Sequence, residues 1–152
     1  MKLWRIAAET RSHAATDLSG RGAASFPGRW NETGLPIIYS ASTLALAVLE
    51  TAAHVDDAGL PLNRFVLQID VPDKVWQQRQ SLDVTTLPLT WSAIPAGSAS
   101  IKMGSDWLKS QASAILLVPS VIVPEIGEVW RLEPASPASR LRTAPPEAAA
   151  AA

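Results

Sequence analysis

Alternation of apolar and polar residues marks two segments of the chain as strands. In Lys2–Ala7, Trp4 and Ile6 lie on either side of Arg5, which predicts an edge strand or a half-buried strand. In Phe65–Val71 apolar and polar positions alternate over most of the segment, which predicts a second strand.

Continuous apolar runs predict further strands. They cover residues 35–41, where Pro36 begins the strand, then residues 114–118 and 121–123, which Pro119 and Ser120 separate, and finally residues 129–132.

One long run of small and apolar residues is typical of a helix. Ser42 or Thr43 can cap a helix that begins at Leu44 and continues to about Val55, because alanine and leucine favour helices and fill this segment. Since nearly all of its residues are apolar or small, we expect the helix to be largely buried. Asp56 and the residues that follow it end the helix.

The segment 74–105 has little periodicity, so only short elements and loops are predicted there. Ser105 and Asp106 can then cap a short helix that ends at about Ser113. Together these elements predict a single α+β domain over residues 1–143, with a mixed, mainly antiparallel sheet and flanking helices. Residues 144–152 are a low-complexity tail of proline and alanine, which we expect to be mobile.

Composition narrows the classes of function. The 152 residues include 13 basic and 14 acidic side chains, and the net charge of −1 argues against a nucleic-acid partner. The absence of cysteine excludes disulfides, thiolate metal sites and a cysteine nucleophile, and no metal site is predicted. No apolar run is long enough to span a membrane, and charges interrupt the N-terminal segment, so we expect a cytoplasmic protein with no membrane partner.

A glycine-bearing segment is the first candidate site. Ser19–Gly34 holds four of the eight glycines, and long loops inside a compact domain usually bind something. Near its end, Arg29 could bind a phosphate while Trp30 packs beneath it. The alternative is a solvent-facing arginine beside a structural tryptophan.

The second candidate is Glu50, a lone carboxylate in the apolar helix. At about 100° per residue, Thr43, Ala47, Glu50 and His54 share one stripe that could line a pocket. The alternative is a wetted face on which Glu50 and His54 form a weak pair.

Three more residues could belong to the same cleft. Arg5 lies within the first strand and Tyr39 ends a buried one, although each could instead be an edge residue with its polar tip in water. Ser120 lies where two apolar runs meet, and a simple turn or bulge would also explain it.

Six landmarks in order resemble the RES domain family over about residues 2 to 132. They are Trp4-Arg5, Gly20 to Ala23, Gly28-Arg29-Trp30-Asn31, Tyr39-Ser40-Ala41-Ser42, Ala47-Val48-Leu49-Glu50 and Val118-Pro119-Ser120. The resemblance implies a fold like that of ADP-ribosyltransferases. It also implies a toxin of a bacterial toxin–antitoxin pair, which consumes NAD by degrading it or by moving its ADP-ribose to a target protein.

By the same resemblance, each candidate residue has a role. Glu50, Arg29 and Tyr39 are the implied catalytic residues. The implied NAD-binding residues are Arg5, Arg29, Trp30, Tyr39, Ser40 and Ser120, of which Ser120 takes the family's serine position. Many relatives continue into an Asn-rich stretch that ends in Asn-Pro and a histidine, whereas this chain continues with residues 128–136, Glu-Val-Trp-Arg-Leu-Glu-Pro-Ala-Ser.

The chemistry of these residue types suits cleavage of NAD. Breaking the nicotinamide–ribose bond develops positive charge on the sugar, which the carboxylate of Glu50 could stabilise. Arg29, and Arg5 with it, could hold the pyrophosphate, and Tyr39 could offer a flat face to nicotinamide. The sequence leaves water, phosphate and a protein side chain open as acceptors.

The expected partners follow from this hypothesis. A free NAD-consuming toxin would harm its own cell, so a cognate antitoxin that blocks the cleft is expected, and exposed apolar surface could support a homo-oligomer. The alternative function is a non-catalytic module that keeps the fold and only binds a nucleotide or an antitoxin.

Overall fold

The strands form one sheet in the computed structural model, which describes residues 1–11, 13–54, 63–124, 127–131, 142–143 and 147–148. Their order is β4-β5-β6-β2-β1-β3-β7, and β8 also pairs with β3. The strands are β1 (Lys2–Ala8), β2 (Ile38–Ala41), β3 (Arg64–Asp70), β4 (Gln80–Ser81), β5 (Ile115–Pro119), β6 (Gly127–Arg131), β7 (Arg142–Thr143) and β8 (Glu147–Ala148). Only β4 and β5 pair in parallel within the described residues, which confirms a mixed, mainly antiparallel sheet.

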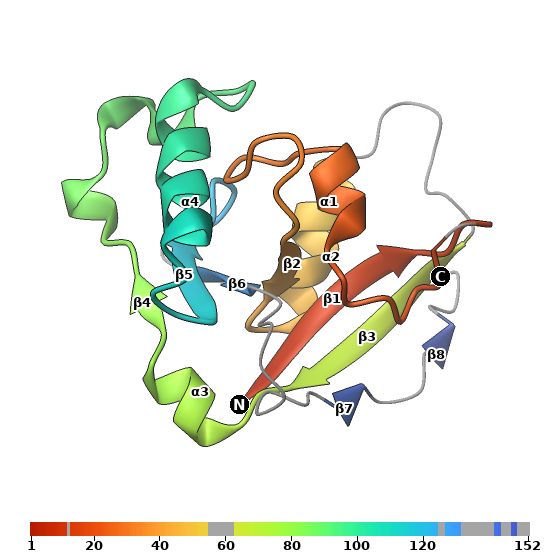
Figure 1. Cartoon of the computed structure of the whole chain (residues 1–152). Helices are drawn as coiled ribbons and strands as arrows, with labels where there is room; N and C mark the ends of the chain where they lie inside the picture. Colours follow the sequence, from red (N-terminus) through yellow and green to blue (C-terminus); the bar gives the residue numbers. More distant parts are fainter. Residues whose placement is uncertain (12, 55–62, 125–126, 132–141, 144–146, 149–152) are drawn as a thin grey trace.

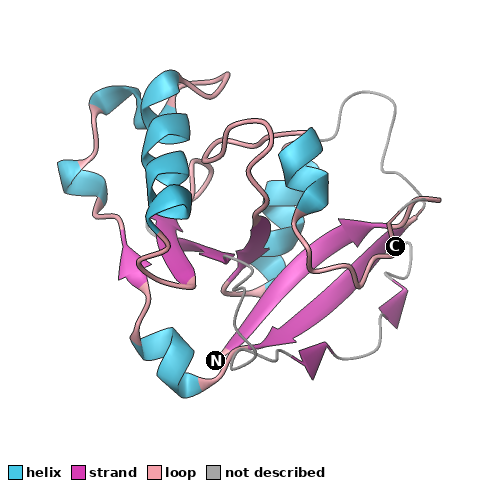
Figure 2. Ribbon diagram, viewed as in Figure 1, coloured by secondary structure: helices cyan, strands magenta, loops and turns pink. Residues whose placement is uncertain are grey.

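Helices flank this sheet (Figures 1 and 2). They are α1 (Arg21–Ser25), α2 (Leu44–Ala52), α3 (Asp73–Gln77) and α4 (Ser98–Ser110), together with the 3₁₀ turns η1 (Val84–Thr86) and η2 (Leu89–Ser92). Helix α4 lies over β5, and α2 lies beside β1 and β2 (Figure 1). The single α+β domain predicted from the sequence is confirmed.

Strand β1 is central rather than at an edge, so that part of the prediction is wrong. It pairs with β3 along its whole length, from Lys2 opposite Asp70 to Ala8 opposite Arg64, and with β2 at Trp4. A charge inside a short strand is usually typical of an edge. Here the guanidinium of Arg5 is accommodated because its Nη1 donates to the carbonyl oxygen of Asp17 at 3.1 Å.

Helix α2 is less buried than its composition predicts. Only Leu46 and Ala47 are buried, whereas the side chains of Leu44, Val48 and Leu49 are 38%, 47% and 48% exposed. The prediction of a largely buried helix is therefore wrong, because an apolar sequence does not say how many faces of a helix are covered. The predicted cap is confirmed at Thr43, whose side chain accepts from the Leu46 amide at 3.1 Å.

Several element boundaries also differ from the predictions. Helix α4 begins at Ser98 rather than at Ser105 and has no side-chain cap, so the signal that we expected at its N-terminus is absent there. The glycine-bearing segment contains the short helix α1, and residues 121–123 form no strand. Most of the tail predicted to be mobile lies outside the described residues, and Glu147–Ala148 within it pairs with β3.

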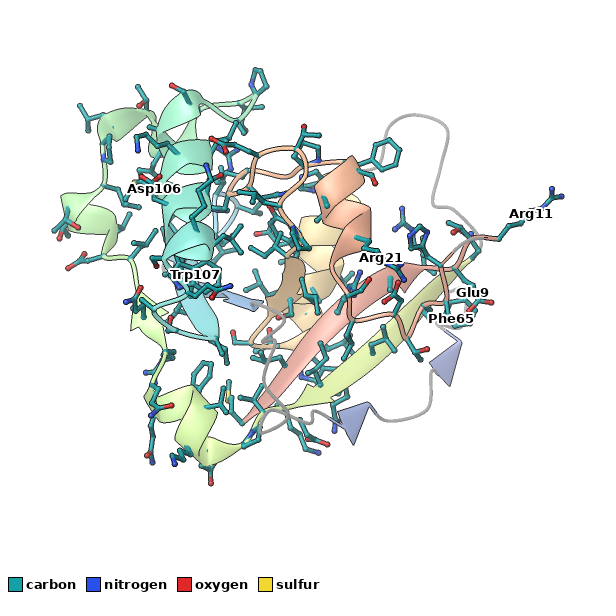
Figure 3. All side chains as sticks on the ribbon, in the orientation of Figure 1. Glu9, Arg11, Arg21, Phe65, Asp106 and Trp107 are labelled. Atoms are coloured by element: carbon teal, nitrogen blue, oxygen red, sulfur yellow. The ribbon has the colours of Figure 1, made fainter. Side chains whose placement is uncertain are left out.

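The largest described core cluster joins α4 to β5 and to the end of the glycine-bearing segment. Trp107 of α4 lies on the helix face turned towards β5 (Figure 3) and packs with Leu116, Val118, Trp30 and Trp91. A second cluster joins β1, β2, β3 and β5 through Leu3, Ile38, Ile69 and Ile115. The first cluster holds one wall of the candidate site.

Candidate active site

Nearly all of the predicted site residues line one cavity of about 1570 Å³. Ligand pockets commonly measure about 300–1,000 Å³, so this cavity has room for a ligand of dinucleotide size. It is lined by Arg5, Arg29, Trp30, Tyr39, Ser40 and Glu50, among others. The shared cavity brings Glu50 and Arg29 to the same site, as the predicted chemistry requires.

Asn31 organises the loop between α1 and β2. Its side chain is fully buried, and its Nδ2 lies within hydrogen-bond distance of the carbonyl oxygens of Ala23, Glu32 and Leu35, at 2.8, 3.2 and 3.0 Å. Its Oδ1 accepts from the Gly28 amide at 2.9 Å. Because a buried amide side chain is stable only when it is paired, this network fixes the path of the loop.

Tyr39 of β2 is tied into the same network. Its hydroxyl donates to Oδ1 of Asn31 at 2.6 Å and accepts from the Trp30 amide at 3.3 Å. A Cβ atom on Gly28 would lie 2.5 Å from this hydroxyl, so only glycine fits there. Since the hydroxyl is engaged by the loop, the part of Tyr39 suited to a ligand is the ring.

Arg29 is half-buried and links the loop to η2 and to the residue that follows it. Its Nη1 donates to the carbonyl oxygens of Trp91 at 3.0 Å and Ala93 at 2.7 Å. The structure therefore does not support the alternative of a purely solvent-facing arginine. These two bonds orient the planar guanidinium, which is a group suited to contact with an anion.

Trp30 has mainly a packing role. Its side chain is 1% exposed and stacks on Trp91, with ring centroids 6.3 Å apart and an interplanar angle of 28°. It was predicted to pack beneath Arg29 and to contact NAD. The observed burial leaves almost no surface of the ring for a ligand, so we infer that Trp30 supports the loop instead.

The carboxylate of Glu50 is held by Ser120. The Oγ of Ser120 donates to Oε1 of Glu50 at 2.5 Å and accepts from the amides of Ile122 at 3.1 Å and Val123 at 2.9 Å. Ser120 is fully buried and is not among the residues that line the cavity. It lies behind Glu50 and orients it, whereas the sequence predicted a direct contact with NAD.

The predicted polar stripe on α2 largely faces the cavity. Ala47, Glu50 and His54 line it, and Thr43 serves as the cap. His54 does not pair with the carboxylate of Glu50, because its Nδ1 lies 2.7 Å from the Glu50 carbonyl oxygen instead. The stripe therefore presents the carboxylate to the cavity without a neighbouring cation on the same helix.

Arg5 and Asp17 lie together in another part of the cavity. Burial lowers the pKa of Arg5, and the negative charge of Asp17 opposes this shift. The Ser19 amide donates to the Asp17 carboxylate at 2.8 Å, and hydrogen bonding by Ser19 is the main reason why the pKa of Asp17 is lowered. Both groups are charged near neutral pH. Ser40, also predicted to contact NAD, is buried in β2 and lines the same cavity.

Two residues of the site were missed as functional residues from the sequence. Asn31 was noticed only as part of a motif, because nothing in a sequence shows that a polar side chain is buried. Arg64 begins β3 and lines the cavity, and its only signal in the sequence is a charge directly before the predicted strand Phe65–Val71. Among the described residues, no group of three side chains could hold a metal ion, and no helix is long and apolar enough to cross a membrane.

Comparison with known proteins identifies the family. The RES domain model matches residues 2–148. The Prs ADP-ribosylating toxin of Sphingobium sp. (strain YBL2) is 53% identical over 122 residues, which cover 80% of this chain and 76% of that protein. Toxin Res of Photorhabdus laumondii is 39% identical over 125 residues, covering 82% and 76%. Toxin Res of Yersinia enterocolitica is 37% identical over 124 residues, covering 82% and 78%. The chain therefore belongs to the RES domain family.

Proposed function

We propose that this protein is the toxin of a toxin–antitoxin pair and an enzyme that cleaves the nicotinamide–ribose bond of NAD. One observation carries the proposal most directly: Glu50, held by Ser120, lines the same large cavity as Arg29 and Tyr39. The toxin names of the relatives support the biological role. They favour it over a module that only binds a nucleotide or an antitoxin.

Glu50 would stabilise the charge that develops during cleavage. The carbon–nitrogen bond breaks, its electron pair leaves with nicotinamide, and the ribose becomes an oxocarbenium-like cation. Ser120 engages Oε1 of Glu50, and no described residue donates a hydrogen bond to Oε2. We infer that Oε2 faces the ribose, where a fixed negative charge lowers the energy of the transition state.

The loop side of the cavity would hold the parts of NAD that lie on either side of the cleaved bond. The ring of Tyr39 would lie against nicotinamide, because its hydroxyl is occupied by Asn31. Arg29 would contact the negatively charged part of NAD from a position that its bonds to two backbone carbonyls define.

The proposal also concerns the group that accepts ADP-ribose after the bond is cleaved. An acceptor oxygen or nitrogen attacks the ribose carbon that nicotinamide has left, and its proton passes to solvent or to a nearby base. The name of the Sphingobium relative describes transfer of ADP-ribose by that protein. By analogy we favour transfer to a protein over release to water or phosphate.

The purified protein with NAD alone tests cleavage and acceptor together. We expect nicotinamide release that Glu50→Gln abolishes and that Asp106→Asn leaves intact, because Asp106 is on α4 outside this cavity (Figure 3). Free ADP-ribose would show hydrolysis, and release that depends on an added protein would show transfer. If the unaltered protein consumes no NAD under either condition, the enzymatic proposal fails.

A cognate antitoxin would act on this same cleft. Leu44, Val48 and Leu49 of α2 and Ile122 after β5 are exposed, and Ile122 also lines the cavity. An antitoxin segment that covers these apolar side chains would obstruct the approach to Glu50. We expect the toxin to act in the cytoplasm, where NAD is available, and the antitoxin to protect the cell there.

A further inference from the structure

Arg64 is a cavity residue to which neither the sequence motifs nor the proposed mechanism gives a role. It begins β3, opposite Ala8 of β1, and its side chain is half-buried. Its Nε is buried and has no hydrogen-bond partner among the described residues. We propose that Arg64 binds a phosphate group, either in the pyrophosphate of the dinucleotide or as free inorganic phosphate. The first of these two sources rests on the proposed function.

A buried hydrogen-bond donor without a partner is energetically costly. More than nine-tenths of buried polar groups in proteins have a partner, and an unpaired donor on a charged group is especially unfavourable. The Nε of arginine lies beside an Nη on the same edge of a planar fork, which matches two oxygens of a phosphate. Because protein atoms cover the Nε in this structure, the side chain would turn this edge of the fork into the cavity when an anion binds, and the anion would then satisfy the Nε of Arg64.

The other arginines of the cavity are held by the protein itself. Arg5 donates to the carbonyl oxygen of Asp17, and Arg29 donates to the carbonyl oxygens of Trp91 and Ala93. Arg21 is exposed, and its Nη2 lies 3.7 Å from a carboxylate oxygen of Asp17. Arg64 differs from all three because its buried Nε is unmatched among the described residues, so we assign to Arg64 a phosphate contact in addition to the contact proposed for Arg29.

The acidic residues of the cavity do not neutralise Arg64 either. Asp17 accepts from the Ser19 amide and pairs with Arg21. Glu32 pairs with Lys109 at 2.8 Å, and Glu50 accepts from Ser120. No ion pair of Arg64 with a described carboxylate is present. The positive charge of Arg64 is therefore suited to a bound anion, and the cavity that Arg64 lines is large enough to hold one.

Binding measurements can isolate this contact from catalysis. We would use Glu50→Gln as the parent, so that NAD is not consumed, and titrate it with NAD, ADP-ribose, nicotinamide riboside and inorganic phosphate by calorimetry. Arg64→Met removes the donors, and Arg64→Lys keeps the charge but loses the fork. Arg11→Met is the matched control, since Arg11 extends away from the molecule (Figure 3) and does not line the cavity.

We expect Arg64→Met to weaken the binding of NAD and ADP-ribose by about ten- to a hundredfold, the usual effect of lost hydrogen bonds to a charged group. Arg64→Lys should weaken it less. Nicotinamide riboside, which has no phosphate, should bind all variants equally, and Arg11→Met should match the parent. Loss of inorganic phosphate binding alone would identify free phosphate as the ligand.

The outcomes separate this proposal from the proposed function. If Arg64→Met and Arg64→Lys keep the parent's thermal midpoint and bind all four probes as the parent does, the assignment of Arg64 is wrong. If NAD does not bind the parent but inorganic phosphate binds through Arg64, the anion site stands and the NAD-cleaving function fails. If Arg64→Met does not fold, the comparison of Arg64→Lys with Arg11→Met decides the question in the same way.

Discussion

The cavity has two walls that are built in different ways. The loop wall consists of residues 28–32 with Tyr39, and it is held by the network around Asn31 and by contact with α4. The carboxylate wall presents Glu50, and Ser120 lies behind it; the two residues are separated by 70 positions in the chain and joined by one side-chain hydrogen bond. Among the described residues, several hydrogen bonds around the buried Asn31 hold the first wall, whereas one side-chain hydrogen bond orients the carboxylate of the second.

Because the two walls are held differently, we expect changes in the loop wall to affect mainly stability and changes in the carboxylate wall to affect mainly catalysis. The loop wall is part of the largest core cluster through Trp30 and Tyr39, so changes there should unfold the protein before they alter catalysis selectively. The carboxylate wall lies on a half-covered helix, where a charge can be replaced with little loss of packing. The same cavity should thus give two kinds of variant, depending on the wall that is changed.

The largest effect on activity is expected at the carboxylate wall. Glu50→Gln keeps the shape of the side chain but removes its negative charge, which should reduce kcat for nicotinamide release by roughly a thousandfold or more. The thermal midpoint should change little, because Glu50 is only half-buried and Gln can still accept from Ser120. A Glu50→Gln protein that loses stability in proportion to activity would contradict the contrast between the walls.

The largest effect on stability is expected where α4 meets the loop wall. A Cβ atom on Gly104 would lie 1.9 Å from the carbonyl oxygen of Trp30, so Gly104→Ala must push the helix and the loop apart. We expect a loss of about 3 kcal/mol in the free energy of unfolding, measured by urea denaturation.

Gly22→Ala is the matched control for this change. A Cβ atom at Gly22 meets nothing within 4 Å, and Gly22 lies in α1, where alanine has the better helix propensity. We expect this variant to be as stable as the parent or more stable by up to about 1 kcal/mol. Equal stabilities of the two alanine variants would show that the loop wall is not packed against α4 as described.

A somewhat smaller loss is expected at the centre of the loop network. Asn31→Ala removes every side-chain hydrogen bond of Asn31 and leaves the Gly28 amide and the Tyr39 hydroxyl without that acceptor. We expect about 2 kcal/mol of destabilisation by thermal or urea unfolding. Asn63→Ala is the control, since Asn63 is exposed and its side chain donates only to the Glu9 carbonyl in the described structure. A loss at Asn31 no greater than that at Asn63 would argue against the network.

Much of the fold could be predicted because periodicity reports local structure. The alternation in β1 and β3 and the alanine-rich run of α2 identified these elements within a few residues. The position of β1 in the sheet could not be predicted, because pairing depends on residues far away in the chain. The extent of α4 was missed because it begins at Ser98 without a capping side chain, and its serine and glycine residues are weaker helix formers than alanine or leucine.

For the site, the sequence identified residue types better than residue contacts. Glu50 was noticed because a charge in an apolar helix needs a reason, and it does line the cavity. Whether Ser120 contacts a ligand or another side chain depends on where the chain turns after β5, which no motif encodes. Arg64 was overlooked for a similar reason, since an unmatched buried donor is visible only once every neighbour is in place.

The smallest effect on activity is expected at Ser120. A change there tests how far the position of the Glu50 carboxylate depends on its hydrogen bond with Ser120. Ser120→Ala removes the donor to Glu50 and also the acceptor for the Ile122 and Val123 amides. Loss of one hydrogen bond to a charged group is worth at least about 1.5 kcal/mol, so kcat should fall roughly tenfold while KM for NAD stays the same, because Ser120 does not line the cavity. Ser81→Ala, at an exposed position of β4, should change neither constant. A rise in KM at unchanged kcat would mean that Ser120 contacts NAD directly, and the two walls would then differ less than the structure indicates.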